Sequence, residues 1–274
     1  MTATASVVDE VNERSQAMQH LEHVMGTVVT IDVYTDQGGA GPELSLALAR
    51  ARAILHRADA VFSTWKPDSP ISRLRRGEIT EREAPAEVVE VLGLCAEARD
   101  ISGGWFDPWA MPGGLDPTGY VKGWAAQRAL DVLTGSGVSG ALVNAAGDVA
   151  GFAGPGFTEP FRIGIADPLA RGRLFCVIEL TGAIATSGTY ERGAHLIDPR
   201  SGRPGARVAS ASVSGPDLGL ADALATALVV AGMEGLPVLD ALVGYEALLV
   251  GFDGTARWTD GFPFATKLVG TAPM

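Results

Sequence analysis

The spacing of apolar side chains in the first hundred residues predicts one strand and three helices. Residues 24–34 (VMGTVVTIDVY) alternate in polarity and are rich in β-branched side chains, which is typical of a strand. Residues 44–62 place their apolar side chains on one helical face. Residues 85–102 do the same before Gly103-Gly104, a pair that favours a helix end, and residues 69–74 predict a short helix start.

The rest of the chain mixes short apolar runs with two further helical patterns. Helices are predicted at 121–133 and 221–230, and strands at 141–143, 161–165, 175–180, 209–213 and 247–252. Strands and helices do not follow a regular βαβ order, and no repeat or linker is visible, so the pattern predicts an α+β fold. We expect residues 1–20 to be a disordered lead and residues 21–274 to form a single domain.

The charge balance narrows the ligands that this domain can bind. Twenty-one basic and thirty-two acidic residues give a net charge of −11, and the chain has no basic run. Nucleic acids and anionic membranes attract proteins through positive charge, so neither is an expected partner. A phosphate-bearing ligand would need a bridging metal ion or backbone amides in such an acidic protein.

Cysteine usage and the N-terminal segment bear on the compartment. Cys95 and Cys176 each lie in an apolar run, so we expect both to be buried; two cysteines are too few for a disulfide framework or a zinc site. The N-terminal residues contain neither an apolar signal region nor a cysteine for a lipid anchor, and no window approaches about eighteen apolar residues. We therefore expect a cytoplasmic protein without a membrane span.

Candidate chemistry is concentrated in six segments, mostly glycine-rich loops, where binding residues are commonly found. They are residues 23–27, 62–72, 104–108, 115–123, 186–202 and 221–227. In the fourth segment Asp116 precedes a turn, Gly119 allows close backbone approach and Lys122 opens a helix. A helix N-terminus beside a lysine favours a diphosphate site, although an ordinary loop with an exposed lysine has the same pattern.

The last two segments offer an imidazole and a pair of oxygen ligands. His195, one of four histidines, lies between a turn of small residues and an Asp-Pro-Arg turn. Asp222 and Thr226 are four residues apart, so on a helix their side chains share a face. A carboxylate and a hydroxyl with a nearby carbonyl are the hard oxygen ligands that Mg²⁺ selects. The alternative is that Asp222 caps the N-terminus of a buried helix.

Together, eight motifs in this order resemble the ApbE family, the FAD:protein FMN transferases. They are Met25-Gly26-Thr27, Ser63-Thr64-Trp65, Trp105-Phe106-Asp107, 116–123 (DPTGYVKG), 144–148 (NAAGD), 186–190 (TSGTY), 195–204 (HLIDPRSGRP) and 221–227 (ADALATA). The resemblance covers residues 23 to 252 and implies a single T-fold-like domain with a mixed or antiparallel sheet and packed helices.

The resemblance also implies a reaction and a set of site residues. Such enzymes use Mg²⁺ to split FAD, attach FMN to a Thr or Ser hydroxyl of an acceptor protein and release AMP. Mg²⁺ would be held by Asp222, Thr226 and the carbonyl of Gly119, and His195 would orient the diphosphate or relay a proton. The residues implied in FAD binding are Met25, Trp65, Trp105, Phe106, Asp107, Asp116, Lys122, Ser187 and Leu196.

Three departures from the family pattern leave alternatives open. Only eight residues separate Asp107 from Asp116, where many members carry a long insertion, so the chain resembles a compact variant. Ala146-Gly147 replaces the usual glycine pair before Asp148, and the lipoprotein signal of exported members is absent from the sequence. A hydrolase that splits FAD with water, and a flavin-binding carrier without catalysis, are the alternative functions.

Overall fold

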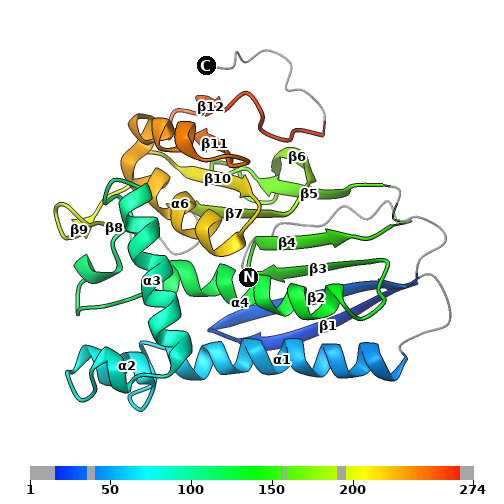
Figure 1. Ribbon diagram of the computed structural model, residues 1–274. Helices are drawn as coiled ribbons and strands as arrows, with labels where there is room; N and C mark the ends of the chain where they lie inside the picture. The colour runs from blue at the N-terminus through cyan, green and yellow to red at the C-terminus, as the bar shows by residue number, and fades with distance from the viewer. Residues whose placement is uncertain (1–15, 36–40, 156, 158, 190–195, 266–274) are drawn as a thin grey trace.

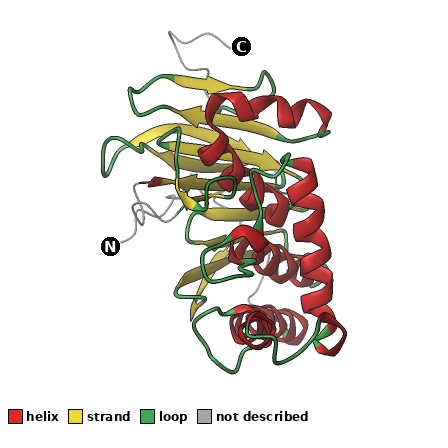
Figure 2. Ribbon diagram, turned by 90° about the vertical axis from the view of Figure 1, so that its left-hand side faces the viewer, coloured by secondary structure: helices red, strands yellow, loops and turns green. Residues whose placement is uncertain are grey.

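An eight-stranded sheet runs through the molecule, and helices pack against one of its faces (Figures 1 and 2). The computed structural model describes residues 16–35, 41–155, 157, 159–189 and 196–265. Neighbouring strands of this sheet are antiparallel throughout, in the order β1-β2-β3-β4-β7-β10-β11-β12. Helices against an antiparallel sheet confirm the α+β prediction.

The strands of the large sheet are β1 (Gln16–Val24), β2 (Thr27–Thr35), β3 (Gly140–Ala145), β4 (Asp148–Ala153), β7 (Ala183–Gly188), β10 (Ser210–Gly215), β11 (Glu246–Val250) and β12 (Ala256–Trp258). Two hairpins stand apart, β5 (Phe161–Ala166) with β6 (Leu174–Leu180), and β8 (Ile197–Asp198) with β9 (Arg203–Pro204). The helices are α1 (Pro42–Phe62), α2 (Pro70–Arg75), α3 (Ala86–Ile101), α4 (Thr118–Thr134) and α6 (Leu218–Ala231), with short 3₁₀ turns η1 (Glu81–Glu83), η2 (Pro108–Ala110) and η3 (Gly232–Ala241).

The predicted first strand is one half of a hairpin. Met25 and Gly26 both have positive φ, 53° and 69°, and form a two-residue turn of the kind that matches strand twist. Residues 16–20, which we expected to belong to the disordered lead, lie in β1; residues 1–15 lie outside the described part. Sequence reasoning missed β1 because it is an edge strand, with Gln19, Leu21 and His23 exposed between core-facing side chains.

Strands β4, β7 and β12 were also missed. In β4 and β7 the side chains are mostly small, as in the sequence AIATSG of β7, so the apolar signal is weak. Both become central strands because β7 pairs with β4 on one side and with β10 on the other. The predicted helices agree with α1, α2, α3, α4 and α6 to within a few residues, and α4 begins at Thr118 rather than 121.

Two apolar cores bury the sheet from both faces. The larger core lies between the sheet and the helices, and its members include Leu55, Val91 and Leu224. The smaller core lies between the other face and the β5–β6 hairpin, and includes Leu142, Ile178 and Trp258. Cys95 and Cys176 are free and buried, as predicted, and burial raises the pKa of each thiol to about 12.

Helix α6 is the most apolar helix of the core. With η3 it forms a 24-residue segment, Leu218–Ala241, which contains an 18-residue window with a mean hydropathy of 1.5. By length and composition alone, this segment could span a membrane. The expectation that no window comes near that limit was therefore wrong. The segment is apolar on nearly every side because α6 is enclosed by α3, α4, β7 and β10, and 72% of its apolar window is buried.

Candidate active site

Helices α4 and α6 approach each other closely because both carry glycine at the contact. A Cβ at Gly123 would lie 2.7 Å from the carbonyl carbon of Leu218. A Cβ at Gly219 would lie 2.6 Å from the Tyr120 ring. Only glycine, which has no Cβ, fits at these two positions. The close contact brings the polar side chains of α4 and α6 together.

The three residues expected to hold a metal ion lie at this contact. Asp222 and Thr226 are one turn apart on α6, and a Cβ built at Gly119 would lie 3.8 Å from Thr226 Oγ1. The N-cap of α6 is Asp217, whose side chain accepts a hydrogen bond from Leu220 N at 2.7 Å. The alternative role of Asp222 as a helix cap is therefore wrong, since Asp222 lies inside the helix.

A buried cluster of charges surrounds Lys122. Its ammonium group forms an ion pair with Asp148 and lies 3.7 Å from Asp222 Oδ2. Asp148 is completely buried and Asp222 is 4% exposed. Burial raises the pKa of the Asp222 carboxyl, and the positive charge of Lys122 opposes that shift. With all three groups ionised, one cation faces two carboxylates, an arrangement that favours a further cation.

Asp148 is the residue that the sequence-based site assignment left out. Its Oδ1 accepts a hydrogen bond from Thr186 N at 3.1 Å. Apart from the Lys122 contact, its Oδ2 has no hydrogen-bond partner among the described residues. The signal was present in the sequence, because the segment 144–148 places a carboxylate directly after a hairpin turn, between strands that are buried.

Strand β7 places one hydroxyl group beside the metal candidates and another on its opposite side. Ser187 Oγ lies 3.1 Å from Thr226 Oγ1, which joins β7 to α6 beside the metal candidates. On the opposite side of the strand, Thr186 Oγ1 lies 2.8 Å from Ser212 Oγ in β10. Ser187 thus lies beside Thr226, and its implied role in FAD binding stays a prediction.

The Trp105–Asp107 segment lies beside this cluster. The Phe106 side chain is 5% exposed and reaches Gly119, since a Cβ there would lie 3.3 Å from Phe106 Cε2. Two guanidinium groups lie over the Trp105 ring, with Arg200 Cζ 3.4 Å and Arg207 Cζ 5.0 Å from its centroid. Such stacking fixes the ring at the edge of the site.

Asp107 and Asp116 stabilise local turns. Asp107 Oδ1 accepts a hydrogen bond from Trp109 N at 2.9 Å and caps η2. Asp116 Oδ1 accepts from the backbone N and the hydroxyl of Thr118, at 3.0 and 2.6 Å, at the start of α4. Each carboxylate therefore orders the loop that leads into Gly119, and Lys122 lies in the second turn of α4 rather than at its opening.

Three other predicted residues, Trp65, Met25 and Leu196, come from segments outside α4 and α6. Trp65 follows α1 and is 93% exposed, and its ring joins no ring pair or cation–π pair of the described residues. Met25 packs on the large core at the β1–β2 turn. Leu196 is buried, and its carbonyl accepts a hydrogen bond from Gly205 N at 3.0 Å. His195 lies outside the described residues.

The donor set fits one kind of metal site. Within the part of the chain that the structure describes, no group of three or more His, Cys, Asp and Glu side chains is placed to hold a metal ion. Asp222, Thr226 and the Gly119 carbonyl offer one charge and hard oxygens, which suits Mg²⁺ completed by water and phosphate oxygens.

Comparisons with known proteins show the fold and the family of this chain. The flavin transferase ApbE from Vibrio cholerae has the same fold, with a TM-score of 0.76 and 22% identity over 89% of this chain and 96% of that one. The protein thus has the flavin transferase fold. The model of the ApbE family matches residues 25–113 and 112–249, which is most of the chain. The chain belongs to the ApbE family.

Two curated relatives carry the name FAD:protein FMN transferase. The protein from Rhodobacter capsulatus is 40% identical over 161 residues, and that from Treponema pallidum (strain Nichols) is 30% identical over 167 residues. The aligned parts cover 56% and 54% of this chain. They span only 29% and 46% of the two relatives, so the chain corresponds to less than half the length of either.

Proposed function

We propose that this protein is a Mg²⁺-dependent transferase that moves FMN from FAD to a Thr or Ser hydroxyl of an acceptor protein and releases AMP. The observation that carries the proposal is the cluster of Asp222, Thr226 and Gly119 beside Lys122, in a chain of the ApbE family. The relatives named FAD:protein FMN transferase support the choice of substrate.

The reaction breaks the phosphoanhydride bond of FAD and forms a phosphoester bond to the acceptor. The acceptor hydroxyl oxygen attacks the phosphorus of the FMN half, the bond from that phosphorus to the bridging oxygen breaks, and AMP leaves with that oxygen. The hydroxyl proton must pass to a base. Such a transfer depends on positioning and charge neutralisation more than on covalent help from the enzyme. Bound Mg²⁺ would supply Lewis-acid stabilisation of the diphosphate.

Each residue of the cluster has a separate role in this reaction. Asp222 provides the charged metal ligand, and Thr226 and the Gly119 carbonyl provide neutral ones. Lys122, paired with Asp148, offers a fixed positive charge to the diphosphate. Three negative groups, the two carboxylates and the diphosphate, would then meet two cationic groups, the ammonium and the metal ion. This balance explains how an acidic protein can bind a doubly charged diphosphate.

The FAD contacts and the base follow from the family motifs. We assign the isoalloxazine to Met25, Trp65 and the Trp105–Asp107 segment, because stacking on aromatic side chains suits a flat ring system. Asp116, Ser187 and the backbone around Leu196 are assigned to the rest of FAD. His195 is assigned as the group that orients the diphosphate or takes the hydroxyl proton, because its ordinary pKa suits transfer near neutrality.

Measuring both products tests the proposal against its two rivals. The protein is incubated with FAD, Mg²⁺ and a co-expressed candidate acceptor, AMP is measured by chromatography, and the acceptor is weighed by mass spectrometry. AMP together with an added FMN identifies a transferase. AMP without the adduct identifies a hydrolase, and FAD binding with neither product identifies a carrier.

A pair of aspartate variants on α6 tests the metal assignment. Asp222→Asn removes the charged ligand, and we expect it to abolish AMP release, as should excess chelator. Asp217→Asn is the matched control, because asparagine caps a helix as well as aspartate does and the cap lies outside the cluster. Full turnover in Asp222→Asn or in chelator would contradict the proposed role of the metal.

A further inference from the structure

Helix α2 is a firmly anchored element between two loops of the proposed FAD site. Its Ile71 side chain is completely buried in the large core. Its N-cap Ser69 is 3% exposed and accepts a hydrogen bond from Ser72 N at 3.0 Å. A helix of only six residues has little stability of its own, so these contacts hold it in place.

The first loop, residues 63–69, carries Trp65 and is held to α2 at both ends. At its start, the Ser63 carbonyl accepts hydrogen bonds from Ser69 Oγ at 2.6 Å and Ser72 Oγ at 3.1 Å. Farther along, the Pro67 carbonyl accepts one from Arg76 Nη2 at 2.7 Å. Trp65 lies between these two attachments, which present its exposed ring from a restrained backbone.

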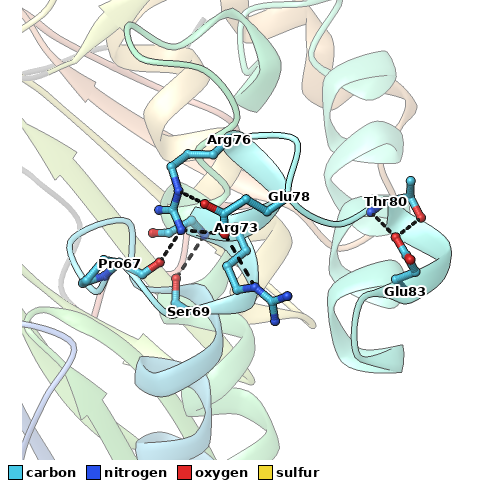
Figure 3. A network of polar contacts seen from close by, with 8 residues as sticks. Pro67, Ser69, Arg73, Arg76, Glu78, Thr80 and Glu83 are labelled. Carbon is cyan, nitrogen blue, oxygen red and sulfur yellow. Dashed lines mark hydrogen bonds and ion pairs between the residues drawn. The ribbon is translucent and has the colours of Figure 1, made fainter.

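Arg76 is itself oriented by a neighbouring carboxylate. Its guanidinium donates to both oxygens of Glu78, at 2.6 and 3.0 Å, while Nη2 also reaches Pro67 (Figure 3). A two-point contact fixes the plane of the guanidinium group. Arg73 of α2 is a weaker partner of Glu78 at 3.7 Å, and among the described residues its side chain donates no hydrogen bond to either loop.

The second loop, residues 105–114, is held by the adjacent arginine. Arg75 donates from Nε and Nη2 to the Gly113 carbonyl, at 3.1 and 2.7 Å. Gly113 has a φ of 86°, which favours glycine, and a Cβ there would lie 2.8 Å from Arg75 Nη2 and displace the guanidinium group. This loop contains Trp105, Phe106 and Asp107 and leads to Gly119 in α4.

We propose that Arg75 and Arg76 are positioning residues for FAD. Arg76, the C-cap of α2, holds the Trp65 loop, and Arg75, the last residue of α2, holds the loop that contains the Trp105–Asp107 segment. The two loops are about 40 residues apart in the chain. The inference rests on the proposed function, in which these loops bind the flavin. Neither arginine reaches the α4–α6 cluster, so their effect falls on FAD affinity and KM rather than on kcat.

The test measures FAD affinity by flavin fluorescence, together with KM, kcat and Tm. Arg75→Gln and Arg76→Gln each lose a charged donor to a loop carbonyl, and we expect a three- to tenfold weaker FAD affinity, with kcat within about twofold and Tm within about 2 °C. Arg73→Gln is the matched control and should bind FAD as the unaltered protein does. Arg75→Lys, which keeps one donor, should recover part of the loss.

A double-substitution cycle separates the two loops. In a Trp65→Ala background, Arg76→Gln should cost no further affinity, because it acts through the Trp65 loop, whereas Arg75→Gln should cost as much as before. Unchanged affinity in both single variants would overturn the inference, as would a loss that tracks a fall in Tm. If the unaltered protein does not bind FAD, the proposed function fails and the positioning role fails with it.

Discussion

The α4–α6 contact predicts the effect of a single methyl group on stability. Gly123 faces the backbone of α6, and a Cβ there would lie 2.7 Å from the carbonyl carbon of Leu218, closer still to its oxygen, and 3.0 Å from the Cα of Gly219. Backbone atoms cannot turn aside as a flexible side chain can. In Gly123→Ala the two helices must therefore separate or tilt.

The magnitude follows from the depth of the overlap. Relief requires a shift of roughly 1 Å between helices packed in the main core, and overpacking of this kind costs about 3 kcal/mol. The better helix propensity of alanine offsets about 1 kcal/mol of this cost. We expect Gly123→Ala to lower the free energy of unfolding by about 2 kcal/mol, which corresponds to a Tm lower by about 4–8 °C.

Gly93 in α3 provides the matched control. It is exposed on a helix, and a Cβ there would meet nothing within 4 Å. Gly93→Ala should therefore raise the free energy of unfolding by about 0.5–1 kcal/mol. Both variants are measured by urea unfolding followed by circular dichroism. If Gly123→Ala is as stable as the unaltered protein, or if Gly93→Ala is the less stable of the two, the reasoning about the contact is wrong.

Two further predictions concern the charges of the site and the proposed base. In Asp148→Asn the Lys122 ammonium loses its carboxylate partner and turns to Asp222, the proposed metal ligand. The affinity of the site for Mn²⁺, used in place of Mg²⁺ because electron paramagnetic resonance detects it, should therefore fall about tenfold. An unchanged Mn²⁺ affinity would show that the ion pair with Asp148 does not prevent Lys122 from pairing with Asp222. His195→Ala should lower FMN transfer at saturating FAD by about 10²–10⁴-fold with little change in FAD affinity. Normal turnover would remove His195 from the chemical step.

The sequence alone determined the features that depend on near neighbours along the chain. Helical spacing predicted α1, α3 and α6 because a long amphipathic or apolar repeat favours one conformation whatever it packs against. The pairing of Asp222 with Thr226 was predictable for the same reason, since four residues make about one turn. The order of the motifs was sufficient to predict the family, because motifs are read directly from the sequence.

Tertiary structure decided what depends on contacts between distant residues. Strand β7 is a poor strand by composition and exists because β4 and β10 flank it. The role of Asp148 appears only when the fold brings Lys122 of α4 and the Thr186 amide of β7 to one carboxylate. The hydrogen bond from Arg75 to the Gly113 carbonyl joins residues that are 38 positions apart in the chain. No local pattern encodes such pairs, because their partners are chosen by the packing of the whole core.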